Sequence, residues 1–105
     1  MTTKKTNQTL EFLEDLMGEK LTFGLYIKSI RQGEELNQVK FAKSLGISKQ
    51  ALCDIEHGRK SISPKKAAEY ADILGYSRRQ FVQLCLQDIL DRDELGLKVD
   101  IENAA

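Results

Sequence analysis

The sequence predicts an all-α fold built around a helix-turn-helix, and three observations in residues 38–57 predict it. The apolar positions of this stretch follow two short helical patterns, first Phe41, Ala42 and Leu45 and then Ile47, Leu52 and Ile55. Gly46 lies where the first pattern ends, and glycine forms a left-handed helix terminus at the lowest cost. Ser48 follows and can cap the second helix. Two helices that meet in this way most often bind DNA.

Two further helices are expected before this motif. Apolar residues recur at helical spacing over residues 9–17, which predicts a short amphipathic helix. A second helical pattern runs from Thr22 and ends near Gly33. A short connection then leads to Asn37, which is a favourable cap for the first helix of the motif.

Two more helices are expected after the motif and its basic loop at residues 58–62. Ser63-Pro64 begins the first of them, because serine is a favourable cap and proline is tolerated at the first helical position. Gly75 ends this helix. Ser77 and Gln80 then have capping-box spacing and begin the last helix.

The last helix has more apolar residues than one narrow stripe needs, so part of it is expected to contact a second subunit or a partner. Residues 97–101 alternate apolar and charged side chains, which predicts a short C-terminal β-strand used in dimerisation. A single strand needs a partner for its backbone, either the same segment of a second copy or another protein. The residues expected at this interface are Phe81, Leu84, Cys85, Leu86, Ile89, Leu97, Val99 and Ile101.

The composition is typical of one small globular domain with short tails, since the 105 residues are 41% apolar and 30% charged. No apolar run approaches the roughly 20 residues that a membrane span needs, and no secretory signal leads the chain. We therefore expect no membrane partner. The two cysteines lack the spacing of a disulfide framework, which favours a reduced, cytoplasmic setting.

The charges are distributed unevenly although they sum to zero. Residues 20–66 hold ten Lys/Arg and four Asp/Glu, whereas residues 67–105 hold four and eight. A basic centre with acidic ends suits phosphate contact on one face and protein contact elsewhere. We expect an N-terminal arm over residues 1–19, the helix-turn-helix domain over residues 20–76, and a dimerisation or partner-binding helix and strand over residues 77–105.

Three segments carry a family resemblance: Gly24-x-x-Ile27-x-x-Ile30-Arg31, Asn37-Gln38-x-x-x-Ala42-x-x-Leu45-Gly46-Ile47-Ser48 and Ile55-Glu56-x-Gly58-Arg59. With their joint spacing, they resemble the Cro/C1/Xre class of helix-turn-helix regulators over residues 22–75. The continuation from Ile62 to Leu84 is similar to the small Xre-type proteins often found as antitoxins in toxin–antitoxin modules.

This resemblance implies a lambda-repressor-like bundle of four to five helices that binds double-stranded operator DNA as a homodimer. It implies that the second motif helix enters the major groove and that Gln38 contacts phosphate. It also implies an ion pair between Arg31 and Glu56. We interpret this pair as structural, because removing one partner leaves a partly buried charge unpaired.

Helix geometry places four candidates for base reading on the side of the second motif helix away from the core, namely Lys49, Gln50, Cys53 and Asp54. Gln50 can donate and accept together, as adenine recognition requires, and the alternative is a solvated side chain. Lys49 can bind guanine or phosphate. Asp54 can accept from cytosine, pair with a nearby cation, or select against other operators. Cys53 is either a small filler or a redox sensor.

The expected phosphate contacts position the domain without reading sequence, and they are Gln38, Ser48, His57, Arg59 and Lys60. For Arg59 and Lys60 the alternative is a plain solvated basic loop. Cys53 and His57 lie four residues apart, a spacing that metal sites use. Because the sequence offers no third ligand nearby, no metal site is expected.

These observations predict a dimeric transcriptional repressor on a palindromic operator, and an autoregulating antitoxin with a toxin protein as a further partner. The alternative is a stand-alone Xre-type or phage-type repressor without a toxin. The sequence shows no nucleophile–base pair and no glycine-rich phosphate loop, so neither an enzyme nor a cofactor is expected. The expected location is the cytoplasm of a bacterial cell, at the nucleoid, whether the gene is bacterial or from a phage.

Overall fold

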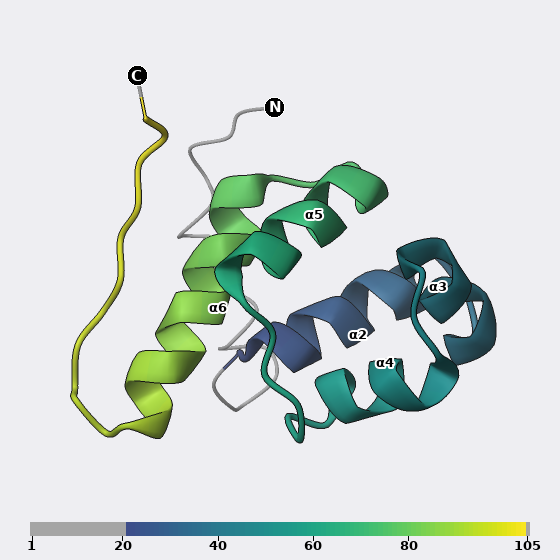
Figure 1. Cartoon of the computed structure of the whole chain (residues 1–105), viewed down its shortest axis with the longest axis horizontal. Coiled ribbons are helices and arrows are strands. Elements are labelled where there is room, and N and C mark those ends of the chain that lie inside the picture. Colours follow the sequence, from purple (N-terminus) through teal and green to yellow (C-terminus); the bar gives the residue numbers. More distant parts are fainter. Residues whose placement is uncertain (1–20, 105) are drawn as a thin grey trace.

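A computed structural model describes residues 21–104 of the chain. These residues contain no strand and form the five α-helices in Figure 1: α2 (Phe23–Gly33), α3 (Gln38–Leu45), α4 (Lys49–Glu56), α5 (Pro64–Leu74) and α6 (Arg78–Arg92). The predicted helix-turn-helix is α3 and α4, and α2, α5 and α6 are the predicted flanking helices. The helix expected over residues 9–17 lies outside the described residues. None of the described helices is long and apolar enough to cross a membrane.

The helices begin and end where the sequence predicts. A side-chain oxygen accepts a hydrogen bond of 2.9 to 3.2 Å from the backbone N–H three residues later at Asn37, Ser48, Ser63 and Ser77. Gly46 ends α3 and Gly75 ends α5, with φ of 74° and 79°. This left-handed region costs glycine the least. Local capping signals therefore define the turn between α3 and α4.

The core continues into α6 through Phe81, which is fully buried. Its ring packs edge-to-face on Phe23 and Tyr26 of α2, with ring centroids 5.7 and 5.6 Å away. Leu84 and Cys85 are buried beside it. These three α6 residues had been expected at an interface, and that expectation needs correction. The chain itself covers them, because α5 and α2 pack on this side of α6.

Gly24 brings α2 directly against the end of α4. A Cβ atom at this position would clash with the carbonyl oxygen of Ile55 and lie 2.9 Å from that of Glu56. Only glycine permits a backbone approach as close as this. The first turn of α2 thus sets the position of the C-terminal end of α4.

The prediction of a β-strand over residues 97–101 is wrong. The chain turns back after α6 and runs beside that helix as an extended segment (Figure 1). Gln87 of α6 donates to the carbonyl oxygen of Leu97 and accepts from the N–H of Val99, both at 2.8 Å. One glutamine side chain therefore occupies the backbone groups that a neighbouring strand would otherwise pair.

The same face of α6 holds the end of this segment. Arg79 donates to the carbonyl oxygen of Ile101, and Gln83 lies 3.5 Å from the N–H of Ile101. Four helical residues rise about 6 Å, which is close to the length of two extended residues. The spacing of Arg79, Gln83 and Gln87 along α6 therefore matches the spacing of backbone groups in the segment.

Five residues of the expected interface remain outside the central core. Ile89 and Leu97 are 37% and 56% exposed. Leu86, Val99 and Ile101 are partly buried. The outer side of α6 and the C-terminal segment are thus the part of this surface that is still open to a partner.

Candidate nucleic-acid interface

One side of α4 is buried against the core and the other faces solvent. Leu52 and Ile55 are 0% and 4% exposed and hold the helix on α2 and α3. Lys49 and Gln50 begin the helix and are exposed, and His57 follows its last residue and is also exposed. The helix therefore presents a short polar surface, as its periodicity predicts.

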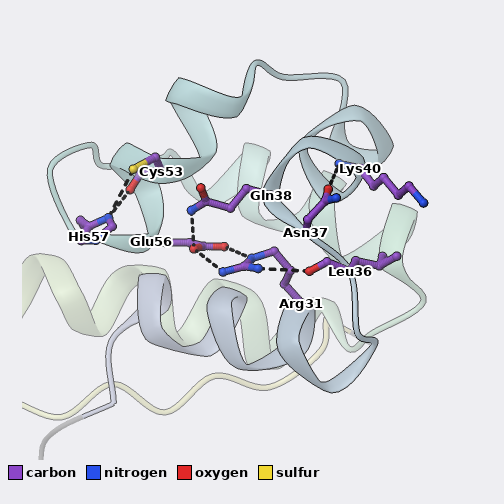
Figure 2. Close-up of polar contacts among 8 residues, drawn as sticks. All are labelled: Arg31, Leu36, Asn37, Gln38, Lys40, Cys53, Glu56 and His57. Carbon is purple, nitrogen blue, oxygen red and sulfur yellow. Dashed lines mark hydrogen bonds and ion pairs between the residues drawn. The ribbon is translucent and has the colours of Figure 1, made fainter.

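A buried carboxylate lies beneath this surface (Figure 2). Glu56 is 4% exposed and accepts two bonds from the Arg31 guanidinium, at 2.7 Å from Nε and 3.1 Å from Nη2. The amide of Gln38 donates to the same carboxylate at 3.0 Å. Arg31 also donates through Nη1 to the carbonyl oxygen of Leu36. One network thus joins α2, α3, α4 and the turn between α2 and α3.

Each donor in this network offsets the cost of burying the charge of Glu56. A buried carboxylate is strongly unfavourable unless a cation and further hydrogen bonds satisfy its oxygens. The paired arrangement of Arg31 and Glu56 that the family resemblance implies is present. Gln38 differs from expectation, since one amide N–H points inward to Glu56. The second amide N–H is the donor left for a phosphate, because the amide oxygen can only accept.

Asp54 has a cation partner within the chain. Its Oδ1 accepts from Gln50 Nε2 at 3.1 Å and from Arg59 Nε at 3.0 Å. The bond from Arg59 is the main cause of a lowered Asp54 pKa, and Gln50 adds to it. Of the alternatives that the sequence left open for Asp54, pairing with a nearby cation is the one present in the free protein.

Cys53 and His57 lie against each other on the same surface (Figure 2). His57 Nδ1 is 2.9 Å from the Cys53 carbonyl oxygen and 3.5 Å from its sulfur. Arg59 also donates to that sulfur at 3.4 Å. Within residues 21–104, no three His, Cys, Asp or Glu side chains lie close enough together to hold a metal ion.

The other two predicted phosphate contacts flank α4. Ser48 accepts a bond from the Ala51 N–H and so caps the helix. Lys60 has an exposed side chain, and its backbone N–H donates to the Asp54 carbonyl oxygen at 3.2 Å. The basic loop therefore remains attached to α4 through its backbone.

Comparison with known proteins supplies the family. Residues 27–81, more than half of the chain, match the helix-turn-helix family model. The chain belongs to the Cro/C1-type helix-turn-helix family. Members of this family are DNA-binding regulators.

A relative of this helix-turn-helix protein carries a more specific name. Antitoxin PezA of Streptococcus pneumoniae serotype 4 is 31% identical over an alignment of 86 residues, and the match covers 74% of this chain. The chain spans about half of that relative, 50% of its length. No solved structure matches the chain.

Lys28 is a further basic residue that the sequence reasoning missed. It lies on α2 and lines a shallow groove beside α4 together with Lys49 and His57. Its position three residues before Arg31 puts both side chains on one face of α2. In a helix-turn-helix protein, that spacing is the available signal for a basic residue near the exposed side of the second motif helix.

Proposed function

We propose that this chain is a sequence-specific repressor that inserts α4 into the DNA major groove. The observation that carries this proposal is the exposed polar side of a short, capped helix, fastened from beneath by the buried Arg31–Glu56 pair. A fixed helix can place side chains against base edges reproducibly. Gln50 is suited to adenine, and Lys49 is suited to guanine or to phosphate. Cys53 lies beside them and contributes shape.

The proposed phosphate contacts surround this reading surface. They are Ser48, His57 and Lys60, the second amide N–H of Gln38, and those N–H groups of Arg59 that Asp54 does not take. Lys28 extends the same basic rim from α2. Contacts of this kind set the position of the helix and contribute most of the salt-dependent affinity.

The proposed unit on DNA is a homodimer on a palindromic operator. Two recognition helices about 34 Å apart would enter successive major grooves on one side of the duplex. The outer side of α6 and residues 97–101 form the proposed contact between subunits or with another partner. Residues 1–19 are a proposed arm, residues 20–76 carry the DNA-binding function, and residues 77–105 carry this contact.

An antitoxin role is the more specific part of the proposal. It is supported by the name of the 31% identical relative and by the excess of acidic residues over residues 67–105. In this role the chain would bind a toxin and repress its own promoter in the bacterial cytoplasm. A stand-alone bacterial or phage repressor is the second candidate, and it needs no toxin.

The test is fluorescence anisotropy of a labelled DNA fragment from immediately upstream of the gene, at several salt concentrations. We expect saturable binding that weakens with salt, because Lys and Arg release counterions from phosphates. Lys49→Ala should weaken binding, whereas Lys98→Ala, with the same change of charge on the C-terminal segment, should leave it nearly unchanged. Equal effects of the two variants would contradict the placement of the site.

Co-purification of the neighbouring gene product with the tagged chain distinguishes an antitoxin from a stand-alone repressor.

A further inference from the structure

The Asp54 carboxylate accepts hydrogen bonds from two neighbouring side chains on the same surface. Gln50 donates to its Oδ1 from one turn earlier on α4, and Arg59 donates to the same oxygen from the basic loop. The backbone carbonyl of Asp54 also accepts from the N–H groups of Arg59 and Lys60, at 2.8 and 3.2 Å. These bonds hold the carboxylate in place between the proposed base-reading side chain and the loop.

This arrangement determines how Gln50 presents its amide. An ionised carboxylate accepts hydrogen bonds and cannot donate, so the amide nitrogen of Gln50 must face Asp54 and its oxygen must face away. One N–H and the oxygen remain free. Adenine recognition uses one donor and one acceptor from the same amide, at N7 and N6 of the base. Without Asp54, the amide of an exposed glutamine is free to rotate between its two orientations.

Asp54 also limits what Arg59 can contact. The two side chains form an ion pair with Nη2 2.9 Å from Oδ1, on a surface where both are partly exposed. A paired guanidinium has fewer donors available for any nearby phosphate. Phosphate contacts raise affinity for all sequences alike, so holding Arg59 back favours discrimination over total affinity.

We propose that Asp54 is a positioning residue that determines sequence specificity without contacting a base. It orients the Gln50 amide for adenine and leaves Arg59 fewer N–H groups for phosphate contact. This inference rests on the proposed DNA-reading role of α4. It is an alternative to direct reading of cytosine by Asp54, for which Oδ2 would be the acceptor, since both side-chain donors bind Oδ1.

The test is selection from a randomised double-stranded DNA library, followed by sequencing, with the full-length chain. Gln50→Ala identifies the base pair that Gln50 reads, as the position where the selected preference is lost. Asp54→Ala and the double variant Gln50→Ala/Asp54→Ala are selected in parallel. Asp72→Ala is the matched control, because it removes the acceptor of another exposed pair, Asp72 with Arg78, away from α4. A cooperative thermal unfolding transition, monitored by circular dichroism, shows that each variant is folded.

We expect Asp54→Ala to reduce the preference at the Gln50-dependent position by about tenfold and to strengthen binding to random DNA at low salt. In the Gln50→Ala background it should have no further effect on that position, because its action passes through Gln50. Asp72→Ala should retain the wild-type preference.

Three results would overturn the inference while leaving DNA binding intact. Asp54→Ala could keep the full preference at that position, it could change a different base pair, or Gln50→Ala could relax no position at all. The second of these would show direct reading by Asp54. Failure of the wild-type chain to enrich any sequence would instead overturn the proposed function, and the inference with it.

Discussion

At the scale of single residues, Glu56 joins α4 to both α2 and α3. Its carboxylate is buried, and its donors, Arg31 and Gln38, come from α2 and α3. Loss of a donor leaves a charge in a poorly hydrated site, which is more costly than loss of an exposed ion pair. The position of α4 and the stability of the domain therefore depend on the same group of side chains.

Arg31→Met should lower the free energy of unfolding by about 3 kcal/mol, because Glu56 loses both bonds of its buried partner. Arg78→Met is the matched control. It makes the same substitution in the exposed pair with Asp72, where both side chains are at least half exposed, so we expect little or no loss of unfolding free energy. Urea denaturation of both variants measures the difference. Equal losses would contradict a structural role for the Arg31–Glu56 pair.

The raised pKa of Tyr26 predicts how the free energy of unfolding changes at high pH. Burial, followed by the nearby Tyr76, raises the pKa of Tyr26 to about 12. The unfolded chain ionises this phenol near pH 10, before the folded chain does, so its contribution is complete below pH 10 and is lost toward pH 12. Relative to Tyr26→Phe, the wild type should lose roughly 1 kcal/mol between pH 9 and pH 11. A pH-independent difference in urea midpoint between the two proteins would argue against the raised pKa.

At the scale of helices, local signals predict most of the structure around α3 and α4. The caps at Asn37 and Ser48 and the left-handed Gly46 define α3, the turn and α4 without reference to the rest of the chain. Contacts between elements that are distant in the sequence are harder to predict from the sequence. The sequence does not reveal that Gln38 donates to Glu56, nor that Asp54 binds Gln50 and Arg59 together, because these depend on rotamers and on the path of a loop.

The C-terminal segment illustrates a different limit. Alternation of apolar and charged residues over 97–101 is common to a strand and to any extended segment that has one side covered. A strand and an extended segment differ in what their backbone groups bond to, and here the backbone bonds to the side chain of Gln87 of α6. Similarly, the apolar pattern of α6 does not tell whether Phe81 lies in the core or at an interface. The packing of α2 and α5 against α6 places it in the core.

Gly24→Ala tests the contact between α2 and α4. The added methyl group meets the Ile55 and Glu56 carbonyl oxygens, so the helices must move apart, at a cost of about 1–3 kcal/mol. Gly33→Ala, at the other end of α2, meets nothing within 4 Å. It should be neutral or stabilising by up to about 1 kcal/mol. Thermal melts of the two variants provide the comparison, and a neutral Gly24→Ala would refute the close approach.

Gln87→Ala tests the attachment of the C-terminal segment to α6. The amide of Val99 loses its acceptor, so its hydrogen exchange should accelerate about fivefold, as expected for one neutral hydrogen bond. Amides within α4 should exchange at unchanged rates, since the bonds of Gln87 join α6 to the C-terminal segment. Exchange followed residue by residue by NMR makes this measurement. Unchanged protection at Val99 would mean that something other than Gln87 holds the segment.

At the scale of the whole molecule, one fold combines a basic stretch and an acidic stretch, to which we propose different tasks. The basic stretch of the sequence, residues 20–66, contains α3, α4 and the loop after them, and this part is proposed to face DNA. The acidic stretch contains α6 and the segment beside it, where Ile89 and Leu97 are exposed. Because α6 also completes the core through Phe81, binding of a partner on its outer side requires no separate domain.

The most direct test of the central claim is an NMR titration of the isotope-labelled chain with the DNA fragment from upstream of its gene. We predict that the largest shifts of backbone amides fall on Lys49–His57 and on Arg59 and Lys60, with small shifts along α6. Shifts that centre on α6 or on residues 97–101, with α4 unaffected, would contradict the account.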